Sequence, residues 1–298
     1  MADAARRTVS RRELSRNQRF EQLSPEVGVL DEDAFREAFD ESPDETLALL
    51  ADMAAATDEK LKHLARSLAG RIFTDVARSG AATRRGAARL VRQRADRSDG
   101  DLDLDASLDH LVYARASGRP IDPGELVVAD WRRPETALCL VIDRSGSMHG
   151  PRLATAAISA AAALFAKTSD CSVIAFADDA IVLKEQLVDR DASAVVDDLL
   201  KLRGSGVTNL ALAMRAARTQ LDHSPATRKV VLVLSDCRVT SGGDPVPAAQ
   251  SIDEIVILAP EGDTEDAEDF AARTGARWAV LSGATSAPAA INELLEAR

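Results

Sequence analysis

An uninterrupted apolar run at residues 230–234, with the sequence VVLVL, is the feature that most constrains the fold. A strand with one face in water alternates apolar and polar residues, whereas a strand covered on both faces is apolar throughout. Further β-rich runs lie at 125–129, 136–142, 172–176, 180–183, 255–258 and 278–281. Helix-length segments separate most of them, at 152–166, 192–202, 210–221, 245–251, 265–274 and 288–297. This alternation predicts an α/β fold with a doubly wound, mainly parallel sheet of the Rossmann-like type.

One pair of neighbouring runs departs from this pattern. The runs at 172–176 and 180–183 are joined by a short turn that contains Asp178 and Asp179. A parallel connection needs a crossover of a dozen or more residues, whereas a hairpin needs only a short turn. We therefore expect one antiparallel strand at the edge of the sheet.

The first part of the chain, residues 1–97, has helical periodicity and no strong strand signal. Ser42, Pro43 and Glu45 together predict a helix start with a capping box, in which Ser42 and Glu45 satisfy the first backbone N–H groups. Residues 98–133 have the composition of a linker, with an aspartate series that leads into a helix start. We therefore divide the chain into a helical N-terminal region (1–97), a linker or segment that precedes the last domain (98–133) and an α/β domain (134–298).

Composition and charge narrow the classes of function. Apolar residues make up 46% and charged residues 29% of the chain, as in a soluble globular protein. The net charge of −11 argues against a chain that coats DNA, and 3% aromatic residues are too few for a platform that stacks nucleic-acid bases. The stretch 60–97 is locally basic, with eleven Lys and Arg residues and two Asp. It is either a solvated helical face or a docking surface for an acidic partner or nucleic acid.

The sequence predicts a cytoplasmic location. The N-terminus has basic residues but no apolar segment of a signal peptide. The longest apolar helix candidate, 154–166, is too short to span a bilayer, so no membrane partner is expected. Cys139, Cys171 and Cys237 form no CxxC pair and lie in or beside apolar runs, which indicates buried reduced thiols.

Polar residues follow the predicted central strands, where ligands bind in such a sheet. Asp143 ends the run at 136–142, and Ser145 and Ser147 follow it in a tight turn. Asp236 follows the run at 230–234, and Thr208 lies in a glycine-rich loop that leads into a helix. Carboxylate and hydroxyl oxygens suit a hard divalent cation, Mg²⁺ or Mn²⁺. Since two carboxylates and three hydroxyls leave the coordination incomplete, an acidic group from another molecule is expected to complete it.

These three clusters, in this order, resemble the metal-ion-dependent adhesion site of von Willebrand factor A (VWA) domains. The resemblance covers residues 134–298 and matches the DxSxS motif at Asp143, Ser145 and Ser147, the threonine at Thr208 and the aspartate at Asp236. It implies a metal-dependent protein-binding module in which the hydroxyls lie nearer the ion and the aspartates act largely through water or hydroxyl groups.

A narrower resemblance extends upstream. The segment 100–108 and the segment 131–134 before the first core strand are similar to bacterial CoxE-type VWA proteins. That family works beside MoxR-type AAA+ ATPases. The resemblance therefore implies an adaptor or co-chaperone of such an ATPase, acting in protein remodelling or metal-cofactor insertion.

Two other functions are alternatives to that of a non-catalytic adaptor. The same ion could serve phosphoryl transfer or hydrolysis. However, Ser145 stands where haloacid-dehalogenase-like phosphatases have a second aspartate, and the chain has no GxxxxGK[ST] loop. The basic segment within residues 1–97 could instead bind nucleic acid or another acidic surface. We expect no catalytic residue and a protein that is not an enzyme.

Overall fold

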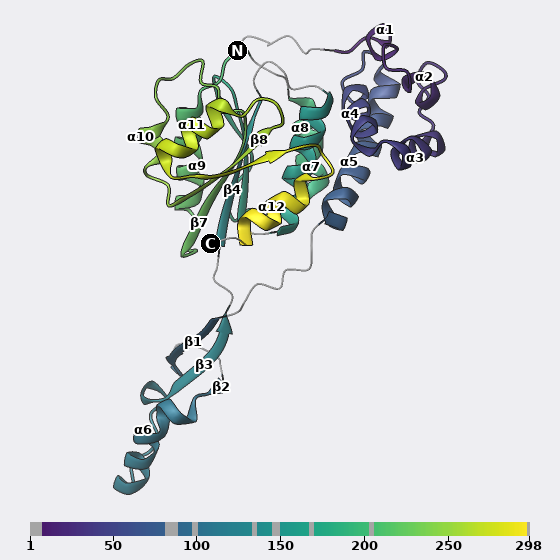
Figure 1. Ribbon diagram of the computed structural model, residues 1–298. Coiled ribbons are helices and arrows are strands. Elements are labelled where there is room, and N and C mark those ends of the chain that lie inside the picture. The colour runs from purple at the N-terminus through teal and green to yellow at the C-terminus, as the bar shows by residue number, and fades with distance from the viewer. Residues whose placement is uncertain are drawn as a thin grey trace. The chain divides into compact units, whose positions relative to one another are not determined.

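The computed structural model describes residues 8–80, 89–96, 101–132, 136–144, 150–166, 170–202 and 206–296 (Figure 1). The chain forms two compact units, one of which consists of Met1–Thr83 and Thr136–Arg298. The other unit is Arg84–Glu135. The α/β domain and the N-terminal helices therefore belong to the same unit, and the segment between them forms its own.

A six-stranded sheet forms the centre of the larger unit. Its strands are β4 (Thr136–Asp143), β5 (Cys171–Phe176), β6 (Ala180–Lys184), β7 (Arg228–Leu234), β8 (Glu254–Pro260) and β9 (Arg277–Leu281). Their order is β6-β5-β4-β7-β8-β9, and every neighbouring pair is parallel except β5 with β6. The predicted doubly wound sheet with one antiparallel edge strand is confirmed.

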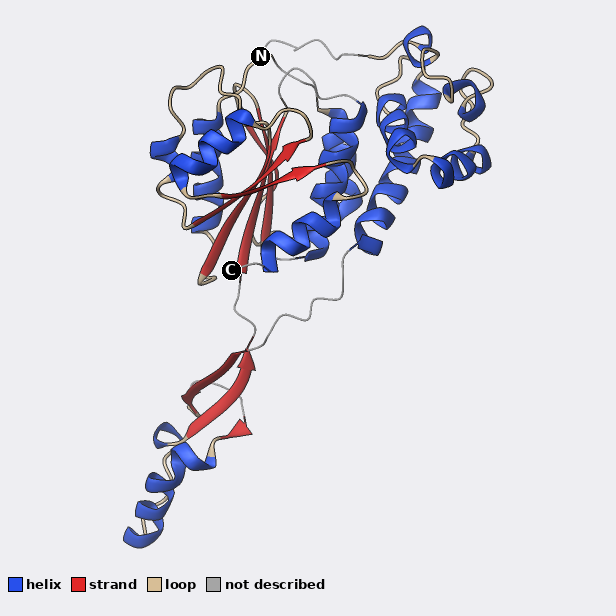
Figure 2. Cartoon of the chain, viewed as in Figure 1, coloured by secondary structure: helices blue, strands red, loops and turns tan. Residues whose placement is uncertain are grey.

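Helices cover both faces of this sheet (Figure 2). One layer contains α9 (Leu210–Asp222), α10 (Val246–Ala249) and α11 (Glu265–Thr274), and the other contains α7 (Gly150–Ala166), α8 (Ala192–Lys201) and α12 (Ala287–Glu296). Successive side chains of a strand point to opposite faces. Accordingly, Leu140 and Ile142 of β4 belong to the core with α7, whereas Cys139 and Val141 belong to the core with α9.

The helices that precede the sheet form a further layer. They are α1 (Arg11–Leu14), α2 (Phe20–Leu23), α3 (Glu32–Glu41), α4 (Pro43–Met53) and α5 (Glu59–Gly80). Both α4 and α5 pack against α7, which is thus enclosed between the sheet and these helices. Helix α7 is rich in alanine, and the residues from Ala156 to Ala161 are all fully buried. A helix that is apolar on all sides is stable only where every side is covered.

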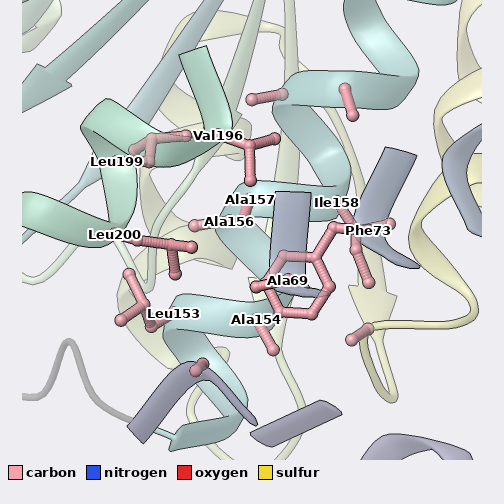
Figure 3. Packing of buried hydrophobic residues seen from close by; sticks show 14 of the residues in the cluster. Ala69, Phe73, Leu153, Ala154, Ala156, Ala157, Ile158, Val196, Leu199 and Leu200 are labelled. Carbon is pink, nitrogen blue, oxygen red and sulfur yellow. The ribbon is translucent and has the colours of Figure 1, made fainter. Parts of the chain in front are cut away.

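A close view shows how this layer packs (Figure 3). Phe73 and Ala69 of α5 lie against the α7 face that carries Ile158 and Ala154. On another side of α7, residues of α8 fill the space beside Ala157. The helical N-terminal region therefore shares one hydrophobic core with the α/β domain.

Helix α4 is also tied to the α/β part by carboxylates near its two ends. Asp44 accepts hydrogen bonds from the backbone N–H of Thr285 (2.8 Å) and from its hydroxyl (3.1 Å). Asp52 accepts a 2.7 Å bond from the backbone N–H of Gly150, the first residue of α7. Gly150 has a φ of +50°, which side-chain-bearing residues rarely adopt.

The predicted capping box at Ser42 is wrong, although α4 does begin at Pro43. Ser42 occupies the N-cap position, but its side chain makes no capping bond. Its hydroxyl instead accepts a 3.0 Å bond from the Arg19 guanidinium, and its carbonyl accepts a bond from the Thr46 hydroxyl. A tertiary contact has thus replaced the local motif.

The smaller unit contains β1 (Arg89–Arg94), β2 (Asp101–Leu102), α6 (Leu104–Ser117), a 3₁₀ turn (Pro123–Glu125) and β3 (Val127–Arg132). Its antiparallel sheet has the order β1-β3-β2. Strand β1 lies within residues 1–97, where the sequence has no strong strand signal, and the segment 98–133 that precedes the α/β domain contains β2, α6 and β3. Strand β1 is rich in arginine and pairs with a strand more than thirty residues later, so its sequence alone gives little strand signal.

The basic stretch 60–97 is divided between the two units. Three described basic side chains in it have internal partners: Arg66 donates to the Ala54 carbonyl, Arg71 pairs with Glu32, and Arg92 pairs with Asp103. These contacts favour the interpretation as solvated structural faces over a single docking surface. Within the described ranges, no helix is both long enough and apolar enough to cross a membrane.

We predict that Phe73→Ala lowers the free energy of unfolding of the larger unit by about 3–5 kcal/mol, because it opens a cavity between α5 and α7. Phe39→Ala is the matched control, since Phe39 is only half-buried, and it should cost clearly less. Urea unfolding followed by circular dichroism measures both. A cost below about 1 kcal/mol for Phe73→Ala would show that α5 and the α/β domain do not share a core.

Candidate metal centre

The candidate site lies at the carboxyl ends of the two central strands. Strands β4 and β7 are parallel neighbours, and Ile142 pairs with Leu234 in their register. Asp143 and Ser235, which come next in the two strands, are therefore adjacent. The Ser235 hydroxyl donates a buried 2.6 Å hydrogen bond to Asp143 Oδ2, and the same oxygen of Ser235 accepts a 2.9 Å bond from the Cys237 N–H.

Asp236 is the second carboxylate at this edge, and its side chain is only 11% exposed. Its Oδ1 accepts a 3.0 Å bond from the backbone N–H of Arg238, and its Oδ2 lies 3.8 Å from the Arg152 guanidinium. Burial raises the pKa of Asp236 above its usual value, and the negative charge of Asp143 adds to this effect. Two carboxylates that repel each other in a desolvated place are an arrangement that a bound cation stabilises.

The turn after Asp236 is conformationally strained. Cys237 has a φ of +60° although it carries a side chain, and it is buried. Burial also raises the pKa of its thiol, so in the metal-free protein this cysteine is a neutral packing group. Backbone strain of this kind costs on the order of 1–3 kcal/mol and is concentrated at functional sites.

Thr208 is held at the same edge by the loop that follows β7. Its N–H donates a 2.8 Å bond to the Thr240 hydroxyl, and its carbonyl accepts bonds from the N–H groups of Thr240 and Ser241. Thr208 is 3% exposed. These bonds use its backbone and leave its hydroxyl available to a ligand.

The neighbour of Thr208 fixes the loop from the other side. Asn209 donates its N–H to the Ala177 carbonyl after β5 and caps α9 through a 3.0 Å bond from Leu212 N–H. Gly242 passes so close that an added Cβ would lie 2.0 Å from Asn209 Oδ1, and its φ of +84° also requires glycine. The loops after β5 and β7 thus hold Thr208 between them.

Ser145 and Ser147 lie outside the described residues, so their positions stay predictions. The ends of their loop are described. Asp143 and Arg144 are buried at its start, and Gly150 is bound by Asp52 at its end. Arg144 pairs with Asp179 and donates its N–H to the Phe176 carbonyl at 2.8 Å. Both ends of the loop are therefore anchored to the surrounding structure.

The oxygen ligands of this candidate site fit a hard divalent cation. Among the described residues, no group of three or more His, Cys, Asp and Glu side chains is placed to hold a metal. A site here would therefore depend on two carboxylates with hydroxyl oxygens and water. Such an oxygen-only set suits Mg²⁺ or Mn²⁺ rather than zinc, which prefers nitrogen and sulfur.

The sequence matches a known family over most of its length. The family described as "VWA domain containing CoxE-like protein" matches residues 64–282 of the 298. The chain belongs to this family. The match runs from α5 through the smaller unit to the end of β9. It therefore includes residues that precede β4 in the sequence as well as those that follow it. No curated protein matches this VWA protein.

Solved structures of other proteins are similar to parts of the chain. A von Willebrand factor type A protein from Catenulispora acidiphila is 20% identical over 57% of this chain and 44% of that one, with a TM-score of 0.45. The PilB minor pilin from Streptococcus sanguinis is 12% identical over 57% and 64%, with a TM-score of 0.43. A conserved hypothetical protein, BatB, from Bacteroides thetaiotaomicron is 17% identical over 54% and 97%, with a TM-score of 0.42. The VWA protein thus spans less than half of the first of these and less than two thirds of the second.

Sequence reasoning placed Asp143 and Asp236 on adjacent strand ends, and the structure agrees. It missed Ser235, Thr240 and Asp52 as supports of the VWA site. Ser235 had a visible signal, because it directly precedes Asp236 at the end of an apolar strand. Asp52 had none, since it lies almost a hundred residues before the loop that it anchors.

We predict that Asp236→Asn stabilises the metal-free protein at neutral pH. An aspartate whose folded-state pKa is raised costs stability when it is ionised, so the cost is present above that pKa and is lost as the pH falls towards the usual value of 3.8. The melting temperature of the variant in EDTA should therefore exceed that of the wild type at pH 7, and the difference should shrink as the pH falls. Excess Mg²⁺ should reverse the order, because it stabilises only the wild type. A variant less stable than the wild type in EDTA at pH 7 would contradict this assignment.

Proposed function

We propose that this protein is a metal-dependent protein-binding module. VWA domains are interaction modules and generally lack enzymatic activity. The observation that carries the proposal is the convergence of Asp143 and Asp236 at the ends of adjacent strands, with Thr208 held at the same edge by the loop that follows β7. Together with Ser145 and Ser147, they would hold Mg²⁺ or Mn²⁺.

The proposed partner is a protein that supplies an aspartate or glutamate to the ion. Two carboxylates and three hydroxyls do not complete an octahedral shell, and the remaining position would favour an anionic oxygen. The desolvated surroundings of Asp236 strengthen such a contact because electrostatic interactions are stronger away from water. The residues bind and orient the ion, and no bond is made or broken at the site.

Family membership suggests the identity of the partner. We infer that the chain acts in the cytoplasm as an adaptor or co-chaperone of a MoxR-type AAA+ ATPase, in protein remodelling or in the insertion of a metal cofactor into a client. Helices α1–α5, which pack on the same core as the α/β domain, would belong to the adaptor itself rather than form a separate nucleic-acid-binding domain.

The test is a pulldown of the MoxR-type ATPase encoded in the same genome, using the full chain as bait with Mg²⁺ or with EDTA. Binding should require Mg²⁺ and should weaken at least tenfold in Asp143→Ala. Asp222→Ala, at an exposed position in α9, is the control that should bind normally. A melting curve in EDTA verifies that each bait is folded. EDTA-insensitive binding that Asp143→Ala leaves intact would overturn the metal bridge.

A further inference from the structure

A cavity of about 640 Å³ opens directly beside Asp143 and Asp236. Its lining is mostly apolar and comes from the ends of β7, β8 and β9 and from the first turns of α7. The apolar side chains that line it are Pro151, Ala156, Leu234, Pro260 and Leu281. Its volume lies in the range of about 300–1,000 Å³ that is typical of ligand pockets. It shares two carboxylates with the candidate metal centre, so a ligand bound to the ion would lie at its mouth.

A cationic group also lines this cavity. The Arg152 side chain is 40% exposed, and its ion pairs with Asp236 and Asp263 are 3.8 and 3.7 Å long. These distances are longer than the roughly 2.7–2.9 Å of a charge-assisted hydrogen bond. The positive charge of Arg152 in the cavity lining gives the site charge complementarity to an acidic segment.

The walls of the cavity are fixed from behind by helix α4. On one side, Asp52 binds Gly150, which precedes the lining residue Pro151. On the other, Asp44 binds Thr285 and lies so close to Gly283 that an added Cβ would be 2.4 Å from its Oδ2. A pocket whose walls are already ordered loses little conformational entropy when it binds a side chain.

We propose that this cavity receives a large apolar side chain next to the metal-bound aspartate or glutamate of the partner protein. The recognised feature is then an acidic residue with a leucine-like neighbour in an extended segment. This inference rests on the proposed function and adds sequence specificity to it, because the ion alone would accept any accessible carboxylate.

The test uses fluorescein-labelled, end-blocked tetrapeptides and the full chain in Mg²⁺, with binding followed by anisotropy. The peptides carry one aspartate with leucine before it, directly after it or two positions after it, and matched peptides carry serine instead of leucine. In at least one arrangement, leucine should tighten binding about tenfold, since burial of such a side chain has at least that effect. Replacement of the aspartate by asparagine should abolish the binding.

A pair of threonine variants locates the effect. Thr155 lines the cavity, and Thr155→Trp should fill it and remove the advantage of leucine while the serine peptide binds as before. Thr219→Trp is the matched control, because both threonines donate to the carbonyl four residues earlier but Thr219 is exposed on α9. Mg²⁺ affinity of both variants should equal that of the wild type, which also shows that they are folded.

Each outcome decides the question. Mg²⁺-dependent binding of the aspartate peptides without any advantage of leucine overturns the pocket and leaves the proposed function standing. Leucine-dependent binding that persists in the asparagine peptide or in EDTA overturns the link between pocket and ion. Failure of every aspartate peptide to bind in a Mg²⁺-dependent way overturns the carboxylate bridge and the pocket with it.

Discussion

The burial of the middle of α7, from Ala156 to Ala161, is the constraint on which the rest of the larger unit depends. This helix presents small apolar residues on all sides, so the sheet and α8 can cover only part of it. Helices α4 and α5 cover the remainder, and Phe73 is the largest side chain of α5 that is fully buried there. Asp52 of α4 binds the N–H of Gly150, the first residue of α7, so the position of α4 also fixes where α7 begins. The stability of the core and the geometry of the candidate site are therefore coupled.

The candidate site depends on supports from several distant segments. Ser235 holds the Asp143 carboxylate, Thr240 holds the backbone of Thr208, and Asp52 holds the start of α7. In each of these contacts, the supporting residue lies far in sequence from the residue that it supports. In the metal-free protein the paired carboxylates are unfavourable, which the raised pKa of Asp236 expresses. The same two carboxylates thus lower the stability of the metal-free protein and raise its affinity for a cation.

The fold and the two carboxylates could be predicted because their signals are local. Apolar runs such as 230–234 mark buried strands, and the rule that ligands bind at strand ends then selects Asp143 and Asp236. The smaller unit could not be predicted in the same way, because β1 is polar in sequence and becomes a strand only through pairing with β3. The capping box at Ser42 failed for the related reason that Arg19, a distant residue, binds its hydroxyl. The support from Asp52 is likewise a tertiary contact that no local sequence pattern indicates. The positions of Ser145 and Ser147 stay predictions.

The central claim is that Asp143, Asp236 and Thr208 contribute to one divalent-cation site. The most direct measurement is a titration of the metal-free full chain with Mn²⁺, with the free ion counted by electron paramagnetic resonance and Mg²⁺ used as competitor. The account predicts one Mn²⁺ per chain that Mg²⁺ displaces, and a loss of that site in Asp143→Ala, in Asp236→Ala and, less completely, in Thr208→Val. Saturable binding of one ion that all three variants retain, or no binding by the wild type, would contradict it.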